Sequence, residues 1–184
     1  MTGFRAVKPG PDEYPPFMAE YVSRVPAGDV VVILKAQTAG TMALLRGLPG
    51  SMGDHSYAPG KWTIRQIVGH LSDAERVFSY RALRFSRGDA APLAGFDEND
   101  YVDAAPFTRV SLSDLIDELE HLRAATIHLF ANLDEDAFTR AGEANGKRTS
   151  VRALAHVITG HEHHHVDVLR ARYLGAATTT ATGS

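Results

Sequence analysis

The chain contains no cysteine among its 184 residues. This absence excludes a disulfide framework, and it excludes every metal site or nucleophile that is built on a protein thiolate. A metal site in this protein would therefore have to be made from histidine and carboxylate side chains.

Long apolar runs and an excess of positive charge are also missing. No window approaches the roughly 18 apolar residues of a membrane-spanning helix, and the N-terminal residues lack the apolar centre of a signal peptide. The formal net charge of -3 gives no general attraction to nucleic acid. We therefore expect a cytoplasmic protein that binds neither a membrane nor nucleic acid.

What is present is the composition of an ordinary globular protein, with 44% hydrophobic and 22% charged residues. The length favours a single domain over residues 1–174. Five prolines among residues 1–27 predict an extended N-terminal segment, with a short helix near 16–23 as an alternative. The small and polar residues 175–184 are typical of a flexible tail.

Four segments carry apolar residues at helical spacing, and they cover residues 30–48, 64–87, 112–133 and 151–174. Capping side chains precede them, namely Asp29, Thr63, Ser111 and either Thr149 or Ser150. Sustained strand-like alternation is absent. The sequence predicts an all-α four-helix bundle with a long crossover, residues 90–110, between the second and third helices. Sites in such bundles are commonly built from side chains on facing helices.

The chemically richest stretch is GHEHHHVDVLRAR, which begins at Gly160. His161 and His165 are four residues apart, so on a helix they lie one turn apart on the same face, in line with the apolar stripe. A catalytic metal site needs about three protein ligands, and His70 is the best third because it lies mid-helix among apolar residues. His164 is the main competitor as a ligand.

Three segments carry a resemblance to a known family. GKWTIRQIVGHLSDAERVFSYRALRFSRGD, LAGFDENDYV and VRALAHVITGHEHHHVDVLRARYL look like the DinB-like, or YfiT-like, superfamily of metal-dependent proteins, over roughly Tyr14 to Leu174. The resemblance implies a four-helix bundle, often a homodimer, with metal ligands at His70, His161 and His165. The extra His163 and His164 depart from the family pattern, and we expect His163 to face solvent.

Charged residues on the second helix suggest further roles. Asp73 is one turn from His70 and is a candidate to orient that imidazole or a metal-bound water, although an ion pair with Arg76 explains it equally well. Arg81 and Arg84 are candidates to hold an anionic substrate, with surface charge as the plainer interpretation. The acidic and aromatic residues 96–101 could cover the site and contribute a carboxylate.

These features predict a metal-dependent enzyme with zinc or nickel, because imidazole suits both ions. The metal would lower the pKa of a bound water or of an external thiol. Resemblance to related families implies a thiol-dependent S-transferase that uses a small thiol such as bacillithiol or mycothiol. A hydrolase is the second enzymatic reading. The opposing prediction is a non-catalytic, metal-stabilised dimer or stress-related binding protein, whose metal would have no open coordination position.

Overall fold

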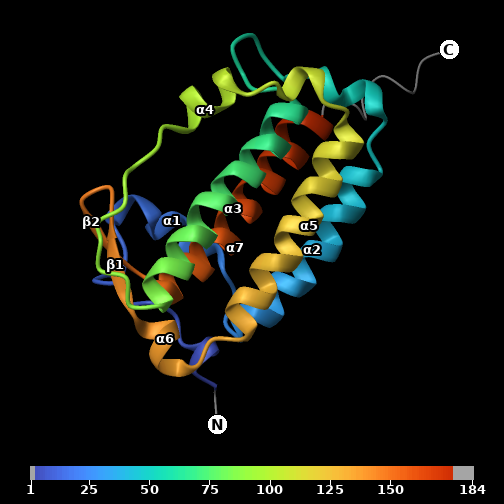
Figure 1. The fold of residues 1–184 in the computed structure, drawn as a ribbon. Coiled ribbons are helices and arrows are strands. Elements are labelled where there is room, and N and C mark those ends of the chain that lie inside the picture. Colours follow the sequence, from blue (N-terminus) through green and yellow to red (C-terminus); the bar gives the residue numbers. More distant parts are fainter. Residues whose placement is uncertain (1–2, 176–184) are drawn as a thin grey trace, which may run out of the picture.

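The computed structural model describes residues 3–175, and four long helices form its body (Figure 1). They are α2 (Val30–Arg46), α3 (Ile64–Ser86), α5 (Leu112–Ala131) and α7 (Val151–Val168), and α7 continues into a π-helical segment, Leu169–Leu174. The predicted all-α four-helix bundle is confirmed. The predicted tail lies outside the described residues except for Gly175.

The helices begin where the capping residues predict. The side chain of Asp29 accepts hydrogen bonds from the first-turn N–H groups of α2, and Thr63 forms a capping box with Gln66 at the start of α3. Ser111 caps α5. Of the two candidates for α7 the structure uses Ser150, whose Oγ accepts from the N–H of Ala153 at 2.9 Å.

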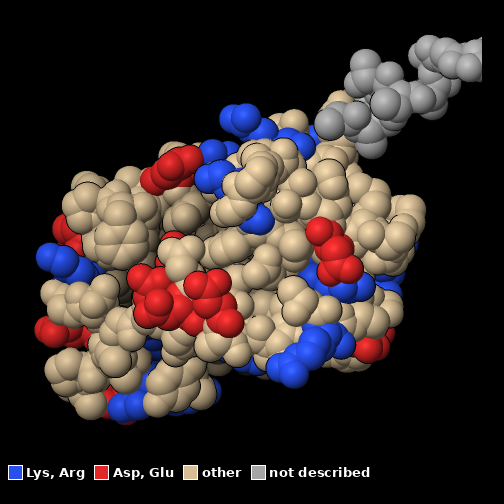
Figure 2. Space-filling model, turned by 90° about the horizontal axis from the view of Figure 1, so that it is seen from above, with Lys and Arg blue, Asp and Glu red and all other residues tan. Residues whose placement is uncertain are grey.

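A long crossover joins α3 to α5, and it contains the short helix α4 (Glu98–Ala104). The N-terminal segment is only partly extended, because it includes a 3₁₀ turn, Pro16–Met18, and helix α1 (Ala19–Arg24). Another short helix, α6 (Glu135–Thr139), follows α5. Within residues 3–175 no helix combines the length and the apolar character needed to span a bilayer. Seen from above, the surface carries acidic and basic side chains interspersed, with one acidic patch (Figure 2).

A small β-hairpin lies between α6 and α7. Strands β1 (Ala141–Ala144) and β2 (Lys147–Ser150) pair antiparallel around the two-residue turn Asn145-Gly146, in which both residues have positive φ, 53° and 66°. Asn-Gly is the preferred sequence for such a turn. The crossover pairs with the hairpin, because the Leu93 N–H donates to the Glu143 carbonyl at 2.9 Å.

A polar layer divides the core into two hydrophobic clusters. One cluster contains Phe85, Phe130 and Leu154, and the other contains Ile64 and Leu115. Between them, along α2, α3, α5 and α7, lie the buried polar residues Thr41, His70, Glu75, Arg123, His161 and Glu162. Burying so many polar groups at one level is costly unless they bind each other or a ligand, so this layer is where a function is expected.

Two glycines allow other segments to approach the helices beside this layer. Gly160 precedes His161, and a Cβ at that position would lie 1.9 Å from the carbonyl oxygen of Tyr21 on α1. Gly69 precedes His70, and its Cβ would lie 2.4 Å from the ring of Phe107. The glycines therefore let α1 and the end of the crossover pack directly against the turns that carry the histidines.

Candidate metal centre

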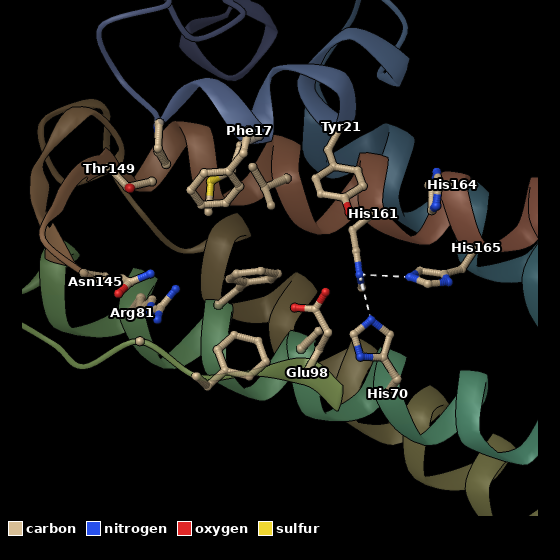
Figure 3. A pocket seen from close by; sticks show the side chains of 18 of the residues that line it. Phe17, Tyr21, His70, Arg81, Glu98, Asn145, Thr149, His161, His164 and His165 are labelled. Atoms are coloured by element: carbon tan, nitrogen blue, oxygen red, sulfur yellow. Dashed lines mark hydrogen bonds between the residues drawn. The ribbon is translucent and has the colours of Figure 1, made fainter. Parts of the chain in front are cut away.

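Three histidines from two facing helices converge on one point (Figure 3). The Nε2 atom of His161 lies 3.0 Å from Nε2 of His70 and 3.1 Å from Nε2 of His165. One ring nitrogen from each histidine lies within 4.8 Å of the others, and His70 and His161 are buried. The structure thus brings together the three residues that the sequence singles out as metal ligands.

All three imidazoles are held in the neutral form that a metal requires. Burial lowers the pKa of His70 to about 4. Burial and the neighbouring His70 lower the pKa of His165 to about 3. Burial, reinforced by His165 and His70, also lowers the pKa of His161 well below its ordinary value. At neutral pH each ring therefore keeps a nitrogen lone pair free for coordination.

The hydrogen-bond arrangement fits a cation better than it fits the histidines alone. Each nitrogen of a neutral imidazole carries either one hydrogen or one lone pair, so Nε2 of His161 can make one good hydrogen bond, as donor or as acceptor. It nevertheless lies within hydrogen-bond distance of both His70 and His165. A cation at the centre would accept one lone pair from each ring. Tetrahedral zinc with Zn–N bonds of 2.0–2.1 Å separates its nitrogens by roughly 3.3 Å, close to the contacts observed here.

The other two histidines of the cluster lie differently. His164 faces the same cavity, but its ring lies 5.1 Å from that of His165 and its Nδ1 lies 3.9 Å from a carboxylate oxygen of Glu20. It does not belong to the group of three that converge. His163 is only half-buried and is not among the residues that line the cavity.

The three histidines form one end of a cavity of about 490 Å³. Aromatic side chains from the N-terminal segment, from α3 and the loop before it, and from the crossover make much of its wall, namely Phe17, Tyr21, Trp62, Phe78 and Phe96. Figure 3 shows Arg81, Asn145 and Thr149 at the end opposite the histidines. A cavity of this size holds a small organic molecule, with its polar groups placed at the two ends.

The two predicted catalytic residues on α3 have different surroundings. Arg81 lines the cavity and is 6% exposed. Asp73 is not among the lining residues, and its carboxylate lies 3.7 Å from the Arg76 guanidinium. The structure therefore does not bring Asp73 to the histidines, and the ion-pair interpretation describes it. Arg84 forms an ion pair with Asp89, so it too is turned away from the cavity.

Three further residues of the site come from other segments of the chain, and of these only Glu98 lies in a segment that the sequence marks as part of the site. Tyr21 comes from the proline-rich N-terminal segment, and its ring lies 5.3 Å from that of His161. Trp62, which lies just before α3, lines the cavity with its ring 4.8 Å from that of His70. Glu98 supplies the carboxylate expected from the crossover, and Figure 3 shows it directed into the cavity near the histidines.

Comparison with known proteins identifies the family. The DinB superfamily matches residues 33–169, which is most of the chain and includes all three converging histidines. The chain belongs to the DinB superfamily. This confirms the resemblance seen in the sequence.

Individual relatives are more distant. A proposed metal-dependent hydrolase of Oceanobacillus iheyensis is 27% identical over 114 residues, which are 60% of this chain and 64% of that protein. The chain thus spans somewhat less than two thirds of this relative's length.

Two solved structures share the fold. YfiT from Bacillus subtilis, a four-helix bundle described as a proposed metal-dependent hydrolase, has a TM-score of 0.69 at 20% identity, and the match covers 79% of this chain and 86% of YfiT. A mycothiol-dependent maleylpyruvate isomerase has a TM-score of 0.61 at 17% identity, with 75% of this chain and 58% of the isomerase covered.

Beside the histidines, this DinB-superfamily protein has a buried ionic network that sequence analysis missed. The Arg123 guanidinium donates to both oxygens of the Glu75 carboxylate, with Nη2 at 2.6 Å from Oε2, and it also binds Glu162. The Thr41 hydroxyl donates to the second oxygen of Glu162. Burial opposes the charge on Arg123, but Glu162 and Glu75 outweigh it and raise its pKa. The network ties α2, α3, α5 and α7 together next to His161.

Another buried histidine, His156 on α7, makes stability depend on pH. Burial lowers its pKa to about 4, and its Nδ1 lies 3.0 Å from the Arg152 carbonyl oxygen. Between pH 6.5 and 4 the unfolded chain binds a proton at this residue that the folded protein does not bind, so stability falls on acidification. For His156→Gln we expect the loss of stability between pH 7 and pH 4 to be smaller by roughly 3 kcal/mol.

The measurement is urea unfolding of both proteins across this pH range, with a chelator present so that metal binding does not contribute. The comparison isolates His156, because the other histidines titrate in both proteins. Parallel pH profiles for wild type and variant would show that His156 is not held neutral in the folded state.

Proposed function

We propose that this protein is a metal-dependent enzyme in which His70, His161 and His165 hold a divalent cation and a thiol or water attacks a small electrophile. The observation that carries the proposal is that three neutral imidazoles converge on the wall of a cavity large enough for a small substrate. When bound, the metal would lower the pKa of the nucleophile and hold it beside the substrate.

The open side of the site favours catalysis over a purely structural role. Among residues 3–175 the converging group consists of three histidines, and no fourth protein ligand joins it. A structural site of tetrahedral geometry is normally closed by a fourth protein ligand, whereas a catalytic site keeps that position for water or substrate. All three histidines line the cavity of Figure 3, so a substrate in that cavity could reach an ion held by them.

Both thiol and water have support as the nucleophile. The chain has no cysteine, so a thiol-dependent reaction needs an external thiol. One structural neighbour is mycothiol-dependent, which supports a small thiol, whereas YfiT and the Oceanobacillus relative are described as hydrolases. We place thiol-dependent transfer first and hydrolysis second. Zinc or nickel as the ion, and a homodimer as the assembly, remain predictions.

Two side chains at the histidine end would assist the reaction, one by a hydrogen bond to the substrate and one by accepting a proton. Burial, together with the nearby carboxylates of Glu98 and Glu20, raises the pKa of Tyr21, so its hydroxyl stays protonated and can donate a hydrogen bond to the substrate. Glu98 is exposed and lines the cavity, so its carboxylate can accept the proton that the nucleophile loses.

Activity measurement on zinc- and nickel-loaded protein tests the proposal. The probes are bacillithiol or mycothiol with 1-chloro-2,4-dinitrobenzene, and p-nitrophenyl acetate without thiol. In the first reaction a carbon–sulfur bond forms, chloride leaves with the bonding electrons, and the thiol proton passes to Glu98 or to solvent. For His70→Ala we expect the rate to fall to that of the uncatalysed reaction while the circular dichroism spectrum is unchanged.

The matched control is His121→Ala, because His121 is exposed on α5, outside the cavity, and its ring contacts the Asp117 backbone carbonyl at 2.6 Å. It should keep the wild-type rate. Thiol-independent ester hydrolysis that is lost in His70→Ala would select the hydrolase. Equal rates for wild type and His70→Ala in both reactions would contradict catalysis at this site.

A further inference from the structure

Arg81 lies at the far end of the cavity from the histidines, on the same face of α3 as His70 (Figure 3). The two residues are eleven positions apart, which is about three helical turns, or roughly 16 Å along the helix axis. The side chain is 6% exposed. The cavity therefore has a buried cation at one end and the candidate metal centre at the other.

Within the described part of the chain, residues 3–175, the charge of Arg81 has no carboxylate partner. Its Nη2 donates to the Ala94 carbonyl at 2.9 Å, and its guanidinium carbon lies 5.9 Å and 5.8 Å from the ring centres of Phe78 and Phe96. Among residues 3–175 no acidic oxygen lies within the 4.0 Å of an ion pair. By contrast, buried Arg123 has two carboxylate partners.

Burying a guanidinium without a carboxylate partner costs free energy. Such a residue is most easily explained where a bound ligand supplies the missing negative charge. Burial lowers the pKa of Arg81, yet an arginine remains charged at neutral pH. The one acidic residue among those that line the cavity, Glu98, lies toward the histidines in Figure 3.

The surroundings of Arg81 are built by several elements of the fold. Asn145 occupies the tip of the β-hairpin at φ 53°, and its N–H donates to the Leu93 carbonyl of the crossover at 2.9 Å. Gly95 allows the close contact, because a Cβ there would lie 2.6 Å from Oδ1 of Asn145. Thr149 on β2 lines the same end. One cation is thus surrounded by neutral hydrogen-bonding side chains.

We infer that Arg81, with Asn145 and Thr149 beside it, is a binding site for a carboxylate of the substrate, remote from the reacting centre. The inference rests on the proposed function for the position of that reacting centre. A single cation with neutral neighbours matches a monoanion, and the planar guanidinium matches a carboxylate through two parallel hydrogen bonds. The aromatic wall between the ends suits an apolar middle. The substrate class is therefore an elongated carboxylic acid with an electrophilic group at its other end.

NMR titration of the metal-free protein tests the carboxylate site. The probes are hexanoate, its neutral analogue hexanamide, and inorganic phosphate, and the observed signals are the Arg81 Nε–H and the Asn145 side-chain amide. We expect hexanoate to shift both signals and to bind at least tenfold more tightly than hexanamide. Equal binding of the two, a preference for phosphate, or no shift with hexanoate would overturn the inference.

Variants show whether Arg81 is responsible for the preference. Arg81→Met should remove the preference for hexanoate over hexanamide, and Arg81→Lys should restore part of it. Arg84→Met is the matched control, because Arg84 lies on the same helix but pairs with Asp89 outside the cavity, and it should keep the full preference. A preference that survives Arg81→Met would overturn the inference. If that variant does not fold, Arg81→Lys and the wild-type shifts decide the question.

The titration is separate from the test of the metal centre. The histidines are neutral at pH 7, so in metal-free protein they offer hexanoate no positive charge. Carboxylate binding without metal-dependent activity would retain the Arg81 site and reject the proposed reaction. Metal-dependent activity without carboxylate binding would retain the proposed reaction and reject the Arg81 site.

Discussion

Replacing His161 with alanine is expected to abolish stoichiometric metal binding. His161 is the central ligand, because its Nε2 lies within 3.1 Å of Nε2 of both His70 and His165, and it is 7% exposed. Losing an outer-shell partner of a metal ligand typically lowers affinity about 10–100-fold. Losing the central one of three ligands should exceed this, so we expect more than about a 100-fold loss.

The measurement is metal content by mass spectrometry after dialysis against zinc or nickel, followed by a competition titration with a chelator. Wild type should hold about one ion per chain, and His161→Ala should hold essentially none. His163→Ala is the matched control, since His163 lies on the same helix but outside the converging group, and it should bind metal like wild type.

Two results would contradict the metal centre. One is wild-type protein that holds no stoichiometric metal under metal-replete conditions. The other is His161→Ala protein that retains its ion with unchanged affinity. Thermal unfolding with and without metal gives an independent readout, because a bound ion stabilises only the proteins that bind it.

Replacing Arg123 with methionine is expected to destabilise the fold by about 3–5 kcal/mol, because it leaves the buried carboxylates of Glu75 and Glu162 without their cation. The Arg123 side chain is 3% exposed, and so is that of Glu75, so water cannot replace the lost hydrogen bonds. Urea unfolding of the two proteins measures the difference in the free energy of unfolding.

Arg46→Met is the matched control for the ionic network. Arg46 also binds two carboxylates, those of Asp117 and Glu120, each at 2.6 Å, but its side chain is 44% exposed. Because solvent screens exposed ion pairs of this kind, Arg46→Met should unfold at nearly the same urea concentration as wild type. A loss of less than about 1 kcal/mol for Arg123→Met would show that the buried network does not stabilise the fold in this way.

A second variant separates the charges from the packing. Combining Arg123→Met with Glu75→Gln and Glu162→Gln removes all three charges, so much of the lost stability should return. Failure to recover would mean that the shape of the arginine side chain, and not its charge, is what the bundle requires.

Local pattern was sufficient to predict the four long helices and the pair His161 and His165. The period of an α-helix is a local property, so apolar spacing and caps such as Asp29 and Thr63 give the long helices directly. The same period places His161 and His165 on one face. The four-residue strands of the hairpin are too short to show alternation, although Asn145-Gly146 does signal the turn.

The roles of Asp73 and Arg81 required the tertiary structure. On a helix Arg81 points within about 20° of the direction of His70, whereas Asp73 is turned away by about 60°. These angles follow from the number of residues that separate each side chain from His70, so the sequence alone gives them. Which of the two directions opens into a cavity depends on where α1, the crossover and the hairpin pack, and those contacts come from distant segments.

The sequence by itself predicted the bundle from residue spacing within single helices, and the same spacing placed His161 and His165 on one face. The family came from the resemblance of whole motifs, which also implied His70 as the third ligand. Only the tertiary structure decided which side chains share a polar layer. Glu75, Arg123 and Glu162 come from three helices, and Tyr21 reaches His161 because Gly160 leaves room for α1. The physical reason is that pairing across helices depends on the packing of whole elements, which no local pattern specifies.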